Sequence, residues 1–125
     1  MTTQIVEATA VTPKITLDPT KNYFSFEGES YPEDVNAFYD PIIKPLETYL
    51  KNAEGKAFEF DFFLTYFNSA STKVFFNLFN LLEDVTEMNS VTVNWKHYEE
   101  DDTAEEFGQD FKEDLVNVSF NFITL

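Results

Sequence analysis

The segment from Phe58 to Phe67 limits the possible folds of this chain more than any other. Large apolar residues stand at every second position from Phe58 to Tyr66, and this alternation is typical of a β-strand. Phe63 and Phe67 occupy positions between them, which predicts that the later part of the strand is buried on both faces. The chain therefore contains a central strand that other elements must cover.

Shorter patterns place further strands on either side of this one. They are expected around Ile15–Leu17, at Tyr23–Gly28, at Val91–Trp95 and at Val118–Phe122. Residues 1–11 are small, polar and β-branched, so we expect them to be loosely ordered or to form an irregular first strand.

A helical pattern follows Pro32 and continues to Lys51. Pro41 and Pro45 lie inside it, and each removes a backbone donor and crowds the preceding turn. We therefore expect the helix to split near Asp40, with its longer part from Pro41 to Lys51.

Two more helices are expected after the central strand. The segment Asn68–Thr72 breaks the strand pattern, and an amphipathic helix follows to about Met88. Thr103 and Glu106 fit a capping box at the start of a third helix. Its apolar face carries Ala104, Phe107, Phe111 and Leu115, and Gly108 weakens it.

The order β-β-α-β-α-β-α-β predicts an α/β fold in one domain that spans residues 1–125. We expect a mixed, largely parallel sheet of about five strands covered by three to four helices. With 125 residues, 43% of them hydrophobic, the chain is large enough for one real core.

Charge separates this chain from several functional classes. The 23 acidic and 8 basic residues give a net charge of −15, which argues against binding to nucleic acids or to anionic membranes. No apolar run reaches the length of a membrane span and no secretion signal is visible, so we expect a cytoplasmic protein. The absence of cysteine excludes disulfides, thiol catalysis and thiolate zinc sites.

The segment from Asn68 to Lys73 has the clearest functional character. Ser69, Ser71 and Thr72 lie together where the central strand gives way to a helix, and the start of a helix is favourable for a phosphoryl group. A structural role is the more common one, because serine at such a position is usually an N-cap. The two roles are compatible, since a capping hydroxyl can also be modified.

The helix that follows carries aromatic residues on two faces. Its main apolar face contains Val74, Phe75, Leu78, Leu81, Leu82 and Val85. Phe76 and Phe79 point nearly the opposite way, so either a neighbouring helix covers them or they are held for a partner.

Several segments together resemble the SiaC family of bacterial regulatory phosphoproteins, whose fold is similar to the STAS-like domains of anti-sigma-factor antagonists. The matching segments, in family order, are Thr12–Ile15, Gly28–Glu33, Phe38–Pro41, Leu64–Lys73 and Trp95–Asp102. The phosphoacceptor threonine of the family falls on Ser69. Because Ala70 and Thr72 also depart from the usual motif, Ser71 and Thr72 are alternative acceptors.

The resemblance implies a protein with no catalytic activity and no cofactor. A Ser/Thr kinase would phosphorylate it and a PP2C-type phosphatase would reverse the modification. The unphosphorylated form would bind and activate a diguanylate cyclase, with Asn68, Ala70, Lys73, Phe76 and Phe79 as the expected phosphate-site or partner contacts.

Three other functions were weighed. His97 and the acidic run Glu99–Asp102 could suggest an enzyme, but their spacing indicates no converging acid–base pair. Asp101, Asp102, Glu105 and Glu106 lack the pattern of a calcium loop, so no metal site is expected. The alternative function is a small module for apolar ligands, lined by some of the 15 phenylalanines.

Overall fold

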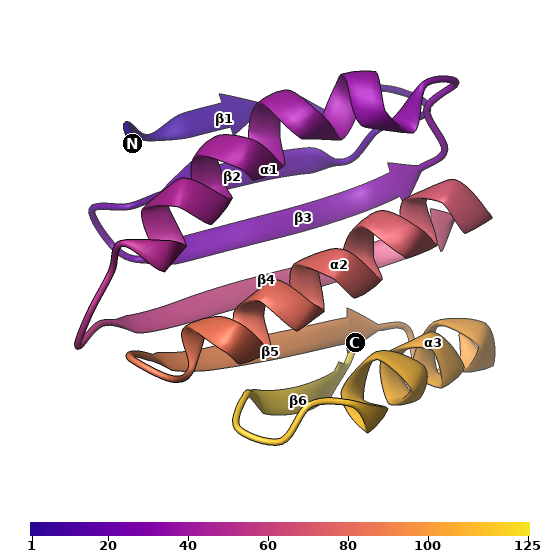
Figure 1. Cartoon of the computed structure of the whole chain (residues 1–125). Helices are drawn as coiled ribbons and strands as arrows, with labels where there is room; N and C mark the ends of the chain where they lie inside the picture. Colours follow the sequence, from indigo (N-terminus) through magenta and orange to yellow (C-terminus); the bar gives the residue numbers. More distant parts are fainter.

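A computed structural model describes all 125 residues and shows one six-stranded sheet with three helices (Figure 1). The strands are β1 (Gln4–Val6), β2 (Lys14–Asp18), β3 (Tyr23–Ser30), β4 (Ala57–Phe67), β5 (Ser90–His97) and β6 (Ser119–Thr124). The helices are α1 (Val35–Lys51), α2 (Ser69–Val85) and α3 (Asp102–Glu113). The predicted α/β class and mixed sheet are confirmed, and of the two alternatives for residues 1–11 the short first strand, β1, is the one observed.

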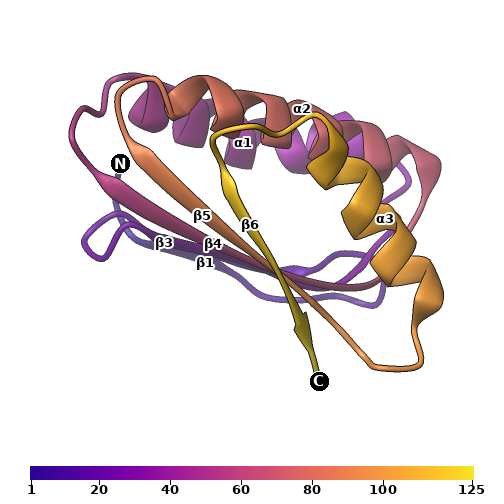
Figure 2. The ribbon, with the colours of Figure 1, turned by 90° about the horizontal axis from the view of Figure 1, so that it is seen from below.

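The strands lie in the sheet in the order in which they occur in the sequence. β1, β2 and β3 pair antiparallel, whereas β3, β4, β5 and β6 pair parallel. Because every helical crossover moves in the same direction and has the same hand, all three helices lie on one face of the sheet (Figure 2). The other face has no helical cover.

Phenylalanine rings fill the space between the sheet and the helices. Phe24 stacks on Phe60 at 4.8 Å between ring centroids, and Phe26 stacks on Phe62 at 5.1 Å. Phe75 of α2 meets the second pair edge-on. The rings therefore pack against one another as a continuous core.

A β-bulge explains the irregular pattern at the end of β4. The β3–β4 register shifts between Gly28 and Glu29, which pair with Leu64 and Tyr66, so Thr65 is an extra residue in β4. The extra residue reverses the alternation of side chains. Phe67 consequently joins the helix-covered core, while Phe63 lies half-buried on the open face. The prediction that this part of β4 is covered on both faces was wrong.

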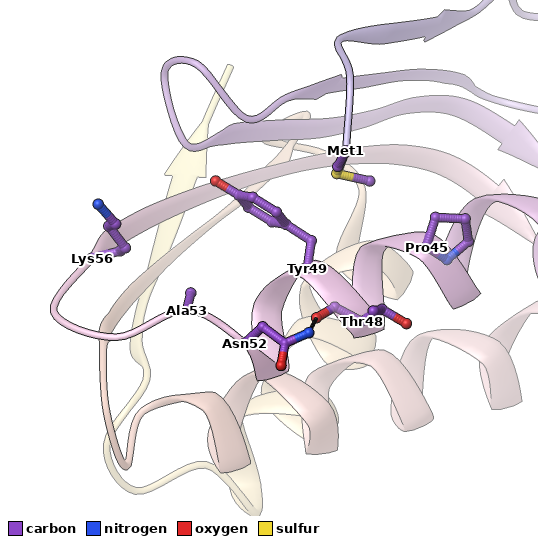
Figure 3. Close-up of a pocket in the computed structure, with 7 residues that line it drawn as sticks. All are labelled: Met1, Pro45, Thr48, Tyr49, Asn52, Ala53 and Lys56. Atoms are coloured by element: carbon purple, nitrogen blue, oxygen red, sulfur yellow. Dashed lines mark hydrogen bonds between the residues drawn. The ribbon is translucent and has the colours of Figure 1, made fainter.

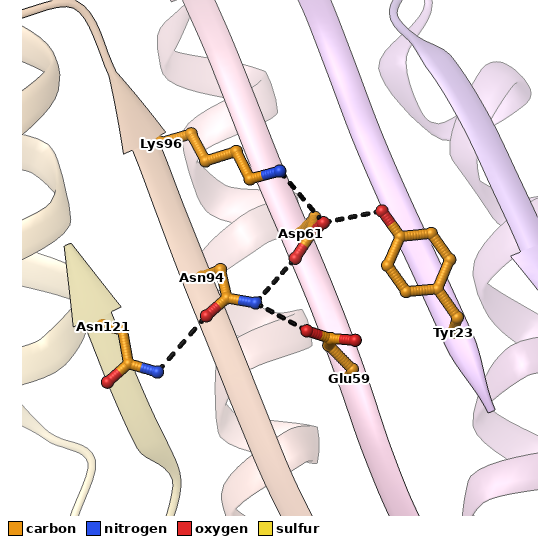
Figure 4. Close-up of polar contacts among 6 residues, drawn as sticks. All are labelled: Tyr23, Glu59, Asp61, Asn94, Lys96 and Asn121. Atoms are coloured by element: carbon orange, nitrogen blue, oxygen red, sulfur yellow. Dashed lines mark hydrogen bonds and ion pairs between the residues drawn. The ribbon is translucent and has the colours of Figure 1, made fainter. Parts of the chain in front are cut away.

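The open face is bridged by polar side chains (Figure 4). Asp61 accepts hydrogen bonds from Tyr23 at 2.6 Å and from Asn94 at 2.8 Å, and it forms an ion pair with Lys96 at 3.2 Å. Burial raises the pKa of Asp61, but these three partners outweigh it and the net pKa is lowered. Burial, followed by the bond to Asp61, raises the pKa of Tyr23 to about 12.

Helix α1 is continuous, so the predicted split near Asp40 was wrong. Pro41 and Pro45 both lie inside the helix and both are exposed. They stand one turn apart on the solvent side, where water can bind the carbonyls that lose their partners. The opposite side of α1 packs on the core and holds the helix together.

Helix α3 begins with a cap that the sequence did not predict. Asp101 is the N-cap, and its side chain accepts a hydrogen bond from the amide of Ala104 at 3.1 Å. The predicted capping box of Thr103 and Glu106 is therefore wrong by two residues. A carboxylate at this position also interacts favourably with the positive end of the helix dipole.

Gly108 allows α3 to approach the sheet closely. A β-carbon at this position would lie 2.6 Å from the Cδ1 atom of Trp95 and 2.6 Å from the Cε1 atom of Phe122. Gly108 is therefore required by packing, although glycine lowers the intrinsic stability of a helix.

We expect Gly108→Ala to lower the free energy of unfolding by about 1–3 kcal/mol, since overpacking outweighs the gain in helix propensity. Urea unfolding followed by Trp95 fluorescence measures the change. Gln109→Ala, at the exposed neighbouring position, is the control and should change little. A Gly108→Ala protein as stable as the parent would contradict the packing argument.

Glu83 ties α2 to the loop before β6. Its carboxylate accepts hydrogen bonds from the amides of Val116 and Asn117 at 3.0 Å and of Val118 at 3.2 Å. Burial raises the pKa of Glu83, but these bonds outweigh it and the net pKa is lowered.

A lowered pKa means that the Glu83 carboxylate stabilises the fold above the ordinary glutamate pKa of about 4.3, and that this contribution is lost as the pH falls below it. We expect Glu83→Gln to cost about 1 kcal/mol at pH 7, a low value because the carboxylate is open to solvent. The difference from the parent should shrink below about pH 4. Glu87→Gln removes an equal charge from an exposed position nearby and is the charge-matched control.

Candidate functional site

The candidate site lies where β4 meets α2, and Asn68 organises it. The side chain of Asn68 accepts a hydrogen bond from the amide of Ser71 at 2.9 Å, and its carbonyl accepts one from the amide of Thr72 at 2.9 Å. Asn68 is thus the N-cap of α2, and the expectation that Ser69 or Ser71 has this role was wrong. The cap leaves the amides of Ser69 and Ala70 without helical partners.

The three hydroxyl groups of this segment have different environments. Ser71 is fully buried, whereas Thr72 is half-buried and its hydroxyl donates to the carbonyl of Asn68 at 3.0 Å. Ser69 is exposed, as are Ala70 and Lys73. Of the three predicted acceptors, only Ser69 lies open to solvent in the folded protein.

Ser71 belongs to a buried chain of hydroxyl groups. Ser30 at the end of β3 donates to the Ser71 oxygen at 2.8 Å, and the Ser30 and Tyr39 oxygens lie 2.6 Å apart. Burial raises the pKa of Tyr39 to about 12, with its hydrogen bond to Ser30 acting in the opposite direction. This chain of hydroxyl groups joins β3, α1 and the first turn of α2.

A shallow hollow of about 350 Å³ adjoins Ser69. Tyr66, Phe67 and Phe107 form its apolar wall, and the same three residues also line a second hollow of about 260 Å³ beside α3. Tyr66 is 53% exposed and meets Tyr31, itself 37% exposed, edge-on at 5.5 Å. Exposed tyrosines beside a hollow are typical of residues that anchor protein partners.

The predicted partner contacts Phe76 and Phe79 are not at this surface. Phe79 is only 1% exposed, and Phe76 is half-buried. Phe111 of α3 covers both, with centroid distances of 4.8 Å to Phe79 and 4.6 Å to Phe76. Of the two alternatives, the neighbouring helix is therefore correct, and Phe79 as a partner contact is wrong.

Tyr31 and Tyr66 are candidate contact residues that the sequence did not single out. Tyr66 continued the alternating apolar pattern of β4 and so was expected to lie in the core. The bulge at Thr65 removes it from that face. No local pattern marks a bulge, although the glycine opposite it, Gly28 with φ of 126°, was a visible signal.

The edge around Ser69 is acidic. The loops after β3 and β5 carry the exposed residues Glu33, Asp34, Glu99 and Glu100, while Lys73 stands one helical turn after Ser69. His97 is buried, with its Nδ1 atom 2.9 Å from the carbonyl of Tyr98. No three His, Asp or Glu side chains converge as a metal site.

The largest hollow, of about 570 Å³, lies at the other end of the sheet (Figure 3). Met1, Pro45, Tyr49 and Lys56 are among its lining residues, which are mixed in polarity. Ten of the fifteen phenylalanines are buried, against one another rather than around a ligand cavity. None of the three helices is long and apolar enough to cross a membrane.

The sequence model of the SiaC family of regulatory phosphoproteins matches residues 6–125. The chain belongs to the SiaC family. An uncharacterized protein of Pseudomonas aeruginosa (strain UCBPP-PA14) is 27% identical over 110 residues, which cover 87% of this chain and 86% of that protein. This SiaC-family chain is thus a regulatory protein rather than an enzyme.

Solved structures show the same fold. SiaC of Pseudomonas aeruginosa superposes with a TM-score of 0.88 and 25% identity over the full length of both chains. A crystal structure of the diguanylate cyclase SiaD in complex with its activator SiaC gives a TM-score of 0.89 and 25% identity, covering 98% of this chain and 99% of the other. The family assignment from sequence is confirmed.

The different burial of Ser71 and Ser69 predicts different effects on stability. Ser71→Ala would leave the buried Ser30 donor without an acceptor, so we expect a loss of about 1–3 kcal/mol in the free energy of unfolding. Ser69→Ala, two residues away and exposed, should change it by less than about 0.5 kcal/mol. Urea unfolding measures both, and equal losses would show that the hydroxyl chain contributes nothing.

Proposed function

We propose that this protein is a cytoplasmic switch that binds and activates a diguanylate cyclase when Ser69 is unmodified. A Ser/Thr kinase adds phosphate to Ser69, and a PP2C-type phosphatase removes it. The observation that carries the proposal is the exposure of Ser69 at the start of α2, beside a hollow with one aromatic wall, while Ser71 is buried and Thr72 is half-buried. The complex of SiaD with SiaC supports a cyclase as the partner.

The fold can accept the modification with little rearrangement. Phosphate adds about −1.5 to −2 charges at pH 7. The free amides of Ser69 and Ala70 and the positive end of the α2 dipole stabilise this added charge by about 0.3–1 kcal/mol. Lys73, exposed on the next turn, is placed to approach the same phosphate.

The docked state would not tolerate the phosphate. Burying a dianion against a partner without compensating cations costs several kcal/mol. This cost is larger than the favourable interaction of the phosphate with the start of α2. The acidic loops on either side of Ser69 add repulsion, and Lys73 is the cation in the first turns of α2. A cost of about 3 kcal/mol weakens binding more than a hundredfold, so phosphorylation blocks docking locally.

Ser69→Ala should therefore bind the cyclase from the native cell and raise cyclic di-GMP synthesis, whereas Ser69→Asp should bind at least about tenfold more weakly, since aspartate carries less charge than phosphate. Co-purification and cyclase assays measure both effects. Asn80→Asp is a matched control that adds the same charge at an exposed position farther along α2. Phosphosite mapping should find phosphate on Ser69.

Equal binding by Ser69→Ala and Ser69→Asp would refute the switch, as would phosphate found only on Ser71 or Thr72. An equal loss in Asn80→Asp would show that the general acidity of the protein, rather than the position of the hydroxyl, controls docking.

A further inference from the structure

The free edge of β6 differs from the rest of this acidic protein. Residues 115–125 contain no charged side chain, proline or glycine, in a chain of net charge −15. Natural edge strands are usually protected by charges, prolines, bulges or short length. β1 at the opposite edge has only three residues, whereas β6 has six. No helix or loop crosses in front of β6 when the sheet is viewed from that edge (Figure 2).

The hydrogen bonds at the chain end show which backbone groups are free. The amide of Leu125 donates to the carbonyl of His97 in β5 at 2.8 Å. Because backbone groups of a strand point alternately to its two sides, those of Phe120, Phe122 and Thr124 point away from β5. Glu83 already occupies the amides of residues 116–118. The unpaired edge is therefore confined to residues 120–124.

We propose that this edge binds a second copy of the chain in antiparallel orientation about a twofold axis at Phe122. In this register Phe122 faces its own copy and Phe120 faces Thr124. All three outward-pointing residues of each strand are then paired, with six hydrogen bonds in total. No register centred closer to the start of β6 achieves this, because Glu83 holds the amides there.

Self-association at this edge is favoured by its local chemistry. β6 carries no charged side chain, so the paired strands place no like charges within the sheet, and the two Phe122 rings become cross-strand neighbours, a favourable pair in sheets. On the helical face the Lys112 ammonium lies 5.6 Å from the Phe122 ring centroid, so the two Lys112 side chains approach the twofold axis and add to the repulsion that salt screens. The twofold axis is perpendicular to the sheet, so both helical layers lie on the same face. The two Ser69 surfaces point in opposite directions and remain free.

The remaining charge weakens the dimer at low salt. Each copy has a net charge of −15, so the two copies repel each other. Added salt weakens this repulsion, because the Debye length is about 10 Å at 0.1 M salt and shorter at higher concentrations. Sedimentation velocity should therefore show a reversible monomer–dimer equilibrium that shifts toward dimer as sodium chloride is raised.

Thr124→Pro removes an outward amide without touching the pairing with β5, and Thr124 is exposed. We expect the association constant to fall by at least about tenfold, because two of the six bonds are lost in the dimer. Thr2→Pro, at an exposed position outside every strand and helix, is the control and should dimerise like the parent. Thermal melting checks that Thr124→Pro still folds.

A disulfide trap tests the register independently, since the chain has no cysteine. Residue 121 faces residue 123 of the copy at a non-hydrogen-bonded position, with about 4.5 Å between Cα atoms, which suits a disulfide. Residue 121 lies about 8 Å from residue 121 of the copy, which is too far. The double variant Asn121→Cys/Ile123→Cys should cross-link efficiently under oxidising conditions, and each single variant should not.

The proposal would be overturned if the protein stayed monomeric at all protein and salt concentrations and the double variant did not cross-link. The edge would then be free to bind an extended segment of another protein. Equal cross-linking of single and double variants, or an undiminished dimer in Thr124→Pro, would place any association elsewhere. These outcomes do not depend on Ser69 or on the cyclase.

Discussion

The burial of a single sheet face governs this structure. All crossovers move across the sheet in one direction, so α1, α2 and α3 share one face and the aromatic core lies between them and the strands. A one-sided sheet must expose its other face to water. Here the exposed face is occupied by a connected set of polar groups around Asp61, in which donors and acceptors meet each other across β3, β4 and β5.

The same topology gathers the functional features at one edge. The carboxyl ends of β3, β4 and β5 lie together, so the loops before α1, α2 and α3 are neighbours. Around the β4–α2 junction, a cap from Asn68 and a buried hydroxyl chain under Ser71 fix the first turn of α2. Because Asn68 caps the helix and Ser71 makes the buried hydrogen bond, Ser69 has no structural role in this turn. Its exposed hydroxyl is therefore available for modification.

The distribution of charge complements this arrangement. Acidic side chains surround the Ser69 edge, whereas the outer strand β6 carries none. The docking surface proposed near Ser69 would depend on charge and respond to phosphate, while the contact proposed at β6 would depend on backbone pairing and would not. One small domain can in this way offer two surfaces that differ in their sensitivity to modification.

Local patterns in the sequence determined the elements, the α/β class and the family. The alternation in β4, the helical spacing in α2 and the serine-rich junction depend on neighbours along the chain, so they could be found without the fold. Tertiary structure decided the rest. Helix α1 survives Pro41 and Pro45 because its inner side packs on the core, and Phe79 is buried because it lies between the sheet and α3. Tyr66 is exposed because of a bulge that only the pairing with β3 defines, and Ser71 is withdrawn from solvent because Ser30, forty-one residues earlier, reaches it. These outcomes rest on contacts between residues far apart in the sequence, and no local periodicity encodes such contacts.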